Sequence, residues 1–124
     1  MLKIGEVNPE HFENIFTITE KDVVITEKQI AHIKERHPQD YERYAGYIPQ
    51  IIKEPDYIIE ANKPNSSVLL KYISENGEYF QLVLRLKAKT DPKDYRNSVI
   101  SFWKIAEEDR KRLIRNKKII YKSE

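Results

Sequence analysis

The amino-acid sequence predicts an α+β domain in which N-terminal helices pack on one face of an antiparallel sheet. Two patterns support this class. In the first half of the chain apolar residues recur at helical spacing, and in the second half they alternate with polar residues as in strands. An Asn76-Gly77 pair between two alternating runs is also typical of a tight β-hairpin. At 124 residues the chain has the length of a single domain.

The first half contains two longer predicted helices with recognisable signals, and a short helix before them. Thr26 and Gln29 match a capping box at the start of the first helix, and Pro38 ends it. Gly46 and Pro49 predict a kink or break within the second helix. The predicted elements of this half are a short helix at residues 8–16 opened by an Asn cap and a Pro, a strand at 22–26, helices at 26–37 and 40–54, and a strand at 56–61.

The second half is predicted to consist mostly of strands. Residues 67–87 alternate on both sides of the Asn76-Gly77 pair and form a hairpin. Residues 87–95 form a polar loop that turns at Asp91-Pro92. Residues 106–116 begin with acidic and end with basic side chains, as the dipole of a helix favours. The remaining predicted strands are residues 96–106 and 117–123.

The composition excludes several classes of function. With 40% hydrophobic and 34% charged residues the chain resembles a soluble domain, and no apolar run is long enough to cross a bilayer. It has no cysteine, so disulfides and thiolate chemistry are excluded and a cytoplasmic location is expected. It has no HExxH motif, closely spaced His/Asp set or Gly-rich phosphate loop, so neither a metal ion nor another cofactor is expected. Ser101 lies in mid-strand rather than on a strained turn, which argues against a Ser-His-Asp hydrolase.

Charge is unevenly distributed along the chain, although the net charge is only +2. Residues 1–84 contain 9 Lys and Arg against 14 Asp and Glu, whereas residues 85–124 contain 13 against 6. Such a basic segment can attract a polyanion, notably through Arg85, Lys87 and Lys89. Within residues 106–116, the charge pattern of a solvated helix explains the basic residues equally well.

Alternation assigns the side chains of the predicted sheet to two faces. Four large apolar residues of one strand share the face that must form the core, namely Phe80, Leu82, Leu84 and Leu86. In the next strand one face carries Asn97, Val99, Ser101 and Trp103, and the other carries Ser98, Ile100 and Phe102. Lys71 interrupts the apolar run VLLKYI, where it shares a face with Leu69 and Ile73.

The sheet face opposite the leucines is a candidate for binding phosphates and bases. The residues that it can gather are Lys71, Arg85, Ser101 and Trp103, with Gln81, Lys87 and Asn97 nearby. Cations would bind phosphates, and the indole ring could stack on a base. Taken singly, each of these residues fits an ordinary solvated sheet face better. Lys71 is the hardest to explain in that way.

His37 is the candidate acid–base residue, because histidine gains and loses its charge near neutral pH. By helical spacing it lies on the same side of its helix as Ile30 and Ile33, at the end of that helix. The alternative is a histidine that packs or caps beneath the helix. His11 and His32 are expected to lie on the surface.

Five parts of the chain, taken together and in order, carry a resemblance. They are ITEKQIAHIKERHP, YIPQIIKEPDYII, the strand around Lys71, the LRLK strand, and NSVISFWKI followed by RLIRNKKIIYK. The set resembles a phage-associated nuclease family of the barnase–EndoU–colicin–RelE-like fold group. The resemblance runs from about Val24 to Lys122, so residues 1–22 would be an N-terminal extension and residues 23–122 the core. It implies two helices followed by a four-stranded antiparallel sheet.

The resemblance also implies metal-independent cleavage of RNA. In such relatives the site combines a helical histidine, a lysine from an early strand and a Ser or Thr two residues before an aromatic residue. In this chain these positions are His37, Lys71, Ser101 and Trp103, with Arg85, Lys87 and Asn97 as further substrate-binding residues. The ribose 2′-OH would attack the adjacent phosphorus and give a 2′,3′-cyclic phosphate, with His37 as acid or base. Lys71 and Arg85 would stabilise the charge on the phosphorane.

Three functions are compatible with the sequence. The first, which we expect, is an endoribonuclease acting as a toxin or phage-associated effector on cytosolic RNA, with tRNA among the candidate substrates. Its partners would be RNA and an immunity or antitoxin protein, it would bind no membrane, and it could be delivered from a phage or another cell. The second is a non-catalytic RNA-binding module on the same scaffold. The third is a protein-interaction domain.

Overall fold

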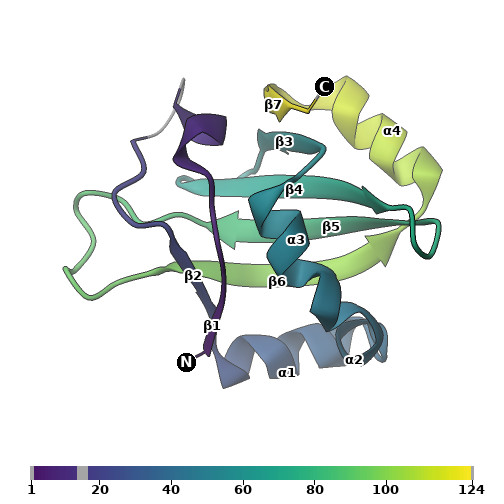
Figure 1. The fold of residues 1–124 in the computed structure, drawn as a ribbon, viewed down its shortest axis with the longest axis horizontal. Coiled ribbons are helices and arrows are strands. Elements are labelled where there is room, and N and C mark those ends of the chain that lie inside the picture. The colour runs from purple at the N-terminus through teal and green to yellow at the C-terminus, as the bar shows by residue number, and fades with distance from the viewer. Residues whose placement is uncertain (1, 14–16, 124) are drawn as a thin grey trace.

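A computed structural model of the chain describes residues 2–13 and 17–123. Within that part of the chain, the strands form a seven-stranded sheet in the order β1-β2-β6-β5-β4-β3-β7 (Figure 1). The strands are β1 (Leu2–Glu6), β2 (Asp22–Ile25), β3 (Tyr57–Glu60), β4 (Ser66–Ile73), β5 (Glu78–Arg85), β6 (Asn97–Ile105) and β7 (Ile119–Lys122). The helices are α1 (Glu27–Arg36), α2 (Asp40–Tyr44), α3 (Ile48–Lys53) and α4 (Glu107–Asn116), with 3-10 helices η1 (Pro9–Phe12) and η2 (Ala45–Tyr47).

The α+β class is confirmed, but the expectation of a four-stranded antiparallel sheet is wrong. The antiparallel strands β3, β4, β5 and β6 form the centre of the sheet, and three short strands extend it. β2 pairs in parallel with β6, with Val23 opposite Asn97, so the sheet is mixed. Residues 1–22, expected to lie outside the core, contribute β1 to the sheet and bury Val7 and Phe12.

The helices begin and end largely where the sequence signals stand. The Thr26 hydroxyl accepts from the Gln29 N–H at 3.1 Å, and the Gln29 side chain accepts from the Thr26 N–H at 3.2 Å, so the capping box of α1 is confirmed. The helix predicted at residues 40–54 is broken into α2, η2 and α3, with Gly46 in η2 and Pro49 in the first turn of α3. Of the short helix predicted at residues 8–16, η1 is present, and residues 14–16 lie outside the described residues.

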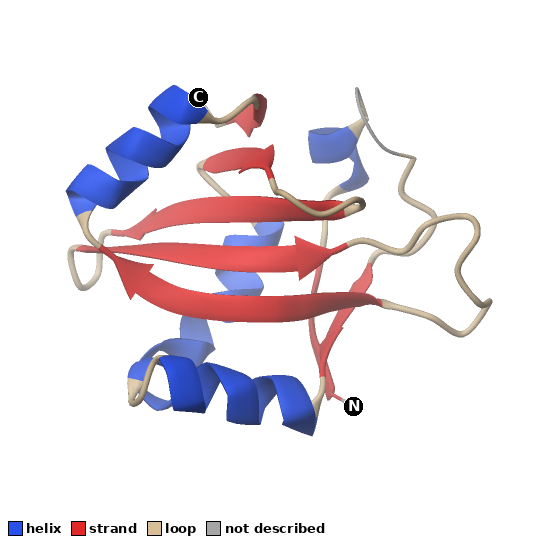
Figure 2. Cartoon of the chain, turned by 180° about the vertical axis from the view of Figure 1, so that it is seen from behind, coloured by secondary structure: helices blue, strands red, loops and turns tan. Residues whose placement is uncertain are grey.

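The main core lies between one face of the sheet and the helices α1 and α3. The fully buried side chains that meet there include Ile33, Ile48, Ile51, Leu69, Phe80, Leu82 and Phe102. The four residues predicted to form the core face, Phe80, Leu82, Leu84 and Leu86, are all at most 1% exposed. Figure 2 shows the opposite face, on which β4, β5 and β6 lie in front of α3.

The helix α4 packs on that opposite face, at one corner of the sheet, so the helices do not all cover one face. Leu113 and Ile114 of α4 contact a second, smaller core cluster made of Ile59, Val68, Leu70 and Ile105. The guanidinium of Arg110 lies 5.3 Å from the ring centre of Tyr57 and 5.1 Å from that of Tyr79. These cation–π contacts fix α4 beside the sheet.

A bulge in β6 changes which of its residues share a face. Ser101 lies opposite Val83, but the next pair along the strands is Val99 with Leu84, so Ile100 has no partner on β5. Val99 is therefore fully buried in the main core, on the same side as Phe102. The strict alternation assumed from the sequence, which placed Val99 with Ser101, is wrong across this bulge.

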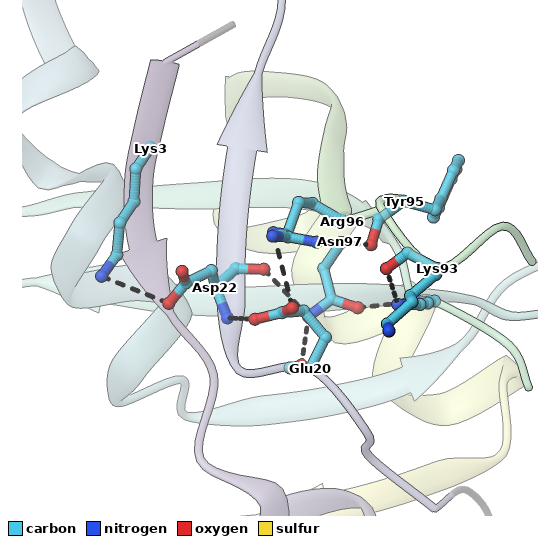
Figure 3. A network of polar contacts seen from close by, with 8 residues as sticks. Lys3, Glu20, Asp22, Lys93, Tyr95, Arg96 and Asn97 are labelled. Atoms are coloured by element: carbon cyan, nitrogen blue, oxygen red, sulfur yellow. Dashed lines mark hydrogen bonds and ion pairs between the residues drawn. The ribbon is translucent and has the colours of Figure 1, made fainter.

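Asn97 joins three segments at the start of β6 (Figure 3). Its side-chain oxygen accepts from the Lys87 N–H at 2.7 Å, and its amide nitrogen donates to the carbonyls of Glu20 at 2.6 Å and Asp22 at 3.1 Å. The residue is 1% exposed. It therefore serves the fold by fixing the 86–96 loop and β2 to β6, and it does not face the substrate side as the sequence suggested.

The N-terminal segment contacts the C-terminal strand through an aromatic stack. The ring of His11 in η1 lies 4.0 Å from the ring of Tyr121 in β7, with 27° between their planes. Burial lowers the pKa of His11, although the nearby Glu10 carboxylate opposes part of this effect. His11 was expected on the surface and is in fact half-buried between the two ends of the chain.

The first prediction concerns Asn97. Replacement by Ala leaves the Lys87 N–H and the Glu20 and Asp22 carbonyls without their partner, so we expect Asn97→Ala to lower the free energy of unfolding by about 3 kcal/mol. Urea denaturation measures this change. Asn116→Ala, at an exposed position, is the matched control and should cost less than about 0.5 kcal/mol. Equal stability of the two variants would contradict the structural role.

The second prediction concerns acid stability. Because the pKa of His11 is lower in the folded chain than the ordinary value of about 6.5, the unfolded chain binds more protons as the pH falls below that value. Stability should therefore decrease from about pH 7.5 to about pH 5, and His11→Gln should lose less over this interval than the native chain. Urea midpoints at both pH values test this. His32→Gln, at an exposed helix position, should show the native loss.

Candidate active site on the open sheet face

The candidate site lies on the open face, defined here as the sheet face opposite α3 (Figure 2). The pairing of the strands determines which side chains lie on this face. Ser101 lies beside Val83 and Trp103 beside Gln81, while Arg85 lies beside Ser66 on the other neighbour of β5. Gln81, Val83 and Arg85 are alternate residues of β5, so they point to the same face. Their partners share that face, because opposed residues in an antiparallel sheet point the same way.

His37 reaches this face from the end of α1. It is the C-cap residue of that helix, with φ −134° and ψ 71°, and its N–H still donates to the Ile33 carbonyl at 2.8 Å. Its ring stacks on Trp103, with 4.7 Å between ring centres and 8° between planes. The structure therefore brings His37 and Trp103 together, and His37 is half-buried against the indole rather than beneath the leucines.

The turn that follows His37 is attached to β6. Gln39 takes a left-handed conformation, with φ 76°, and the Asp40 N–H donates to the His37 carbonyl at 3.1 Å. The Asp40 carboxylate accepts from the Lys104 N–H at 3.1 Å, directly after Trp103 in the chain. Asp40 therefore holds the end of α1 beside Trp103. The sequence reasoning missed this residue, although an acid in the first turn after Pro38 was a visible signal.

Ser101 lies on the same face as Trp103, two residues away, which is about 7 Å along a strand. It is half-buried, and its neighbour Ile100 is the bulged residue. Among the described residues, neither the Ser101 hydroxyl nor the His37 ring nitrogens form a hydrogen bond with another side chain. Stacking occupies a ring face and leaves the nitrogens at the ring edge available, so both groups can contact a ligand.

A cavity of about 680 Å³ opens on this face, lined by Val83, the strand partner of Ser101, and by Ile100, whereas His37, Ser101 and Trp103 are not part of its lining. Its apolar wall includes Val68, Val83, Ile100 and Leu113, and Gln81 and Tyr95 contribute polar groups. The cations at this cavity are Lys63, Arg85 and Lys117, against the single carboxylate of Glu60. An apolar wall with a cationic rim suits a base and its phosphates.

Arg85 lies on the open face, as the sequence predicted, and lines this cavity. Its guanidinium, however, already forms an ion pair. The guanidinium donates to both carboxylate oxygens of Asp91 at 3.2 Å, and it also contacts the Leu86 carbonyl. It lies 5.2 Å from the ring centre of Tyr95, a residue that the sequence did not single out. The Ala88 N–H, and then Arg85, hold the pKa of Asp91 below its usual value. Arg85 therefore shapes the 86–96 loop while lining the cavity.

Lys71 is not part of this face. It lies opposite Phe80, on the helix-covered side of the sheet, with Leu69 and Ile73 as its neighbours on the strand. Ser101 is on the other side, so the expected meeting of imidazole, ammonium and hydroxyl does not form. Lys87 also stands apart, because its side chain donates to the Lys93 carbonyl at 2.7 Å in the 86–96 loop.

Two further features of the described chain bear on the site. No group of three or more His, Cys, Asp or Glu side chains among residues 2–13 and 17–123 is arranged to hold a metal ion. Over the same residues, no helix combines the length and apolar character that crossing a bilayer requires.

A histidine from a helix end, with a serine and a tryptophan of β6 on one sheet face and a cation-rimmed cavity on that face, is a set of groups that a nuclease could use. The comparison with family models agrees. Residues 3–122 match the phage-Barnase-EndoU-ColicinE5/D-RelE like nuclease2 family, and the chain belongs to this family. The match includes most of the N-terminal segment, which the sequence resemblance had left outside. Searches of curated proteins and of solved structures found no match.

The third prediction uses the only tryptophan of the chain. The ring of His37 covers one face of the Trp103 indole, so removing that ring should expose the indole to water. In His37→Ala the emission maximum should move to longer wavelength and quenching by acrylamide should increase. His32→Ala should leave both unchanged, because that residue is exposed elsewhere on α1. Emission and quenching in His37→Ala equal to those of the native chain would show that the stack is absent in solution.

Proposed function

We propose that this chain is a metal-independent endoribonuclease that forms a 2′,3′-cyclic phosphate and a free 5′-OH. The observation that carries the proposal is the stack of His37 on Trp103, on the same sheet face as Ser101. Membership of a nuclease family supports the reaction class. The choice of RNA rests on the histidine, since a ribose 2′-OH provides an internal nucleophile that needs only proton transfer.

The substrate would cross the open face as a single strand. A base would enter the cavity on this face, and the phosphates would meet the cations at its rim. The scissile phosphate would then lie over β6, between the Ser101 hydroxyl and the His37 ring. Single-stranded RNA is the form whose bases are free to enter such a cavity.

In this arrangement His37 moves the proton. Neutral imidazole takes the proton of the 2′-OH while water gives a proton to the departing 5′-oxygen, or imidazolium gives the proton to the 5′-oxygen while water accepts that of the 2′-OH. Trp103 limits the orientations of the ring. Ser101 donates a hydrogen bond to a phosphate oxygen, where charge grows as the phosphorane forms. Lys71 has no role in this step, because it lies on the other side of the sheet.

As a member of a phage nuclease family, the protein would act as a toxin or phage-associated effector on RNA in the cytosol. An immunity or antitoxin protein would be its natural inhibitor. Such a protein would need to cover the open face in order to block access to His37 and Ser101.

The fourth prediction is cleavage of total tRNA or rRNA in the presence of EDTA, with products that end in a cyclic phosphate by mass spectrometry. His37→Gln should slow cleavage by about 10²–10⁴-fold. Ser101→Ala should slow it by about 10–100-fold, the effect of one hydrogen bond to a charged group. His32→Ala supplies the matched control and should stay within about twofold of the native rate. Products from folded His37→Gln at the native rate would refute the assignment.

The location of Lys71 favours one rival function, a non-catalytic RNA-binding module. The open face lacks the ammonium group that was expected to stabilise the charge on the phosphorane. That module would bind RNA with an affinity that falls as salt increases, and it would release no products. Binding measured at several salt concentrations, alongside the cleavage assay, separates the two functions.

A further inference from the structure

We propose a second binding site, for a phosphate-bearing ligand of nucleotide size, on the helix-covered side of the sheet. It is a cavity of about 520 Å³ lined by residues of the N-terminal segment, the end of α3 and the strand β7. The side chains of interest that line it are Lys21, Lys53, Lys71, His11, Tyr121 and Ser123. Neither His37 nor Ser101 belongs to this cavity, so the proposal is independent of RNA cleavage.

Lys71 is the strongest indication of a ligand. Its side chain is only 14% exposed, and its neighbours Leu69 and Ile73 are 0% and 2% exposed. Placing an ammonium there is costly unless its charge is matched and its three N–H donors are used. Among the described residues its ion-pair partner is Asp56 at 3.4 Å, and the other oxygen of that carboxylate accepts from the Tyr72 N–H at 2.7 Å. One long contact leaves donor capacity that an anion in the cavity would satisfy.

His11 provides a second unused polar group. Its Nε2 lies 3.4 Å from the side-chain nitrogen of Asn8, a donor, and this contact favours the tautomer that carries the proton on Nδ1. Nδ1 is buried and has no partner in the described structure. The burial that lowers the pKa of His11 keeps the ring neutral near neutral pH. His11 therefore lines the cavity as a neutral ring with an unused polar group.

The remaining lining completes an anion site with room for more than phosphate. Lys21 and Lys53 are exposed at the rim, and neither forms an ion pair within the described residues. Two carboxylates, Glu6 and Glu54, also line the cavity, and Glu6 is bonded to Lys3 at 2.8 Å. Lys71 is paired with Asp56, so the ammonium groups of Lys21 and Lys53, which have no ion-pair partner within the described residues, give the cavity its preference for an anion. The volume lies within the usual range for small-molecule sites of about 300–1,000 Å³.

The fifth prediction is binding of a nucleoside 5′-monophosphate to the native chain, followed by amide and side-chain NMR shifts. Shifts should saturate at His11, Lys71 and Tyr121, and the nucleoside without phosphate should bind at least about tenfold more weakly, the loss of one charged contact. A titration with inorganic phosphate shows whether the site recognises phosphate alone or the whole nucleotide. Affinity equal to that of the nucleotide would assign the site to phosphate alone, and weaker affinity would assign it to the nucleotide.

The variants test Lys71 directly. Lys71→Met should weaken binding by at least about tenfold, while Lys71→Arg should retain most of it. Lys53→Met, at an exposed position, should weaken binding severalfold without risk to the fold, and the exposed Lys28→Met on α1 is the matched control. RNA cleavage by Lys71→Met should stay at the native rate. Absence of saturable shifts, or equal binding by nucleoside and nucleotide, would overturn the proposal whatever the outcome of the cleavage assay.

Discussion

The pairing of β5 with its two neighbours decides which side chains can act together in this protein. In a pleated sheet a side chain belongs to one face, and opposed residues share that face. Lys71 is opposed to Phe80, and Ser101 is opposed to Val83, so the two groups are separated by the thickness of the sheet. No rotation of a side chain removes that separation. The protein consequently carries two distinct polar regions, the open face and the cavity that contains Lys71.

The position of His37 follows from a different constraint, the geometry of a helix end. α1 packs beside the sheet and buries Ile33, and a residue four positions later would remain on the same side if the helix continued. Pro38 stops the helix, so His37 leaves helical geometry and its ring can reach Trp103. Asp40 then fixes the turn through the Lys104 N–H. The hydrogen bond from the Lys104 N–H to the Asp40 side chain thus connects the turn to β6 and supports the orientation of the His37 ring.

Local signals in the sequence predicted the elements well, and long-range pairing explains the failures. The capping box at Thr26 and the break near Gly46 are short-range effects, and both are present. The bulge at Ile100 carries no glycine or other marker, yet it reverses the face of Val99. The parallel pairing of β2 with β6 likewise depends on contacts between distant segments. For Lys71 the alternation with Leu69 was correct, and the error lay in placing it beside residues of the opposite face.

The position of α4 limits what the open face can accept. Arg110 between Tyr57 and Tyr79, together with Leu113 and Ile114, fixes this helix over one corner of the sheet. The cavity on this face is lined by Leu113 of α4 and by Tyr95 of the 86–96 loop. A paired base cannot enter a cavity of this size while its partner strand remains attached, whereas an unpaired base can. If the open face binds RNA as proposed, the same helix that completes the second core would favour unpaired nucleotides over a duplex.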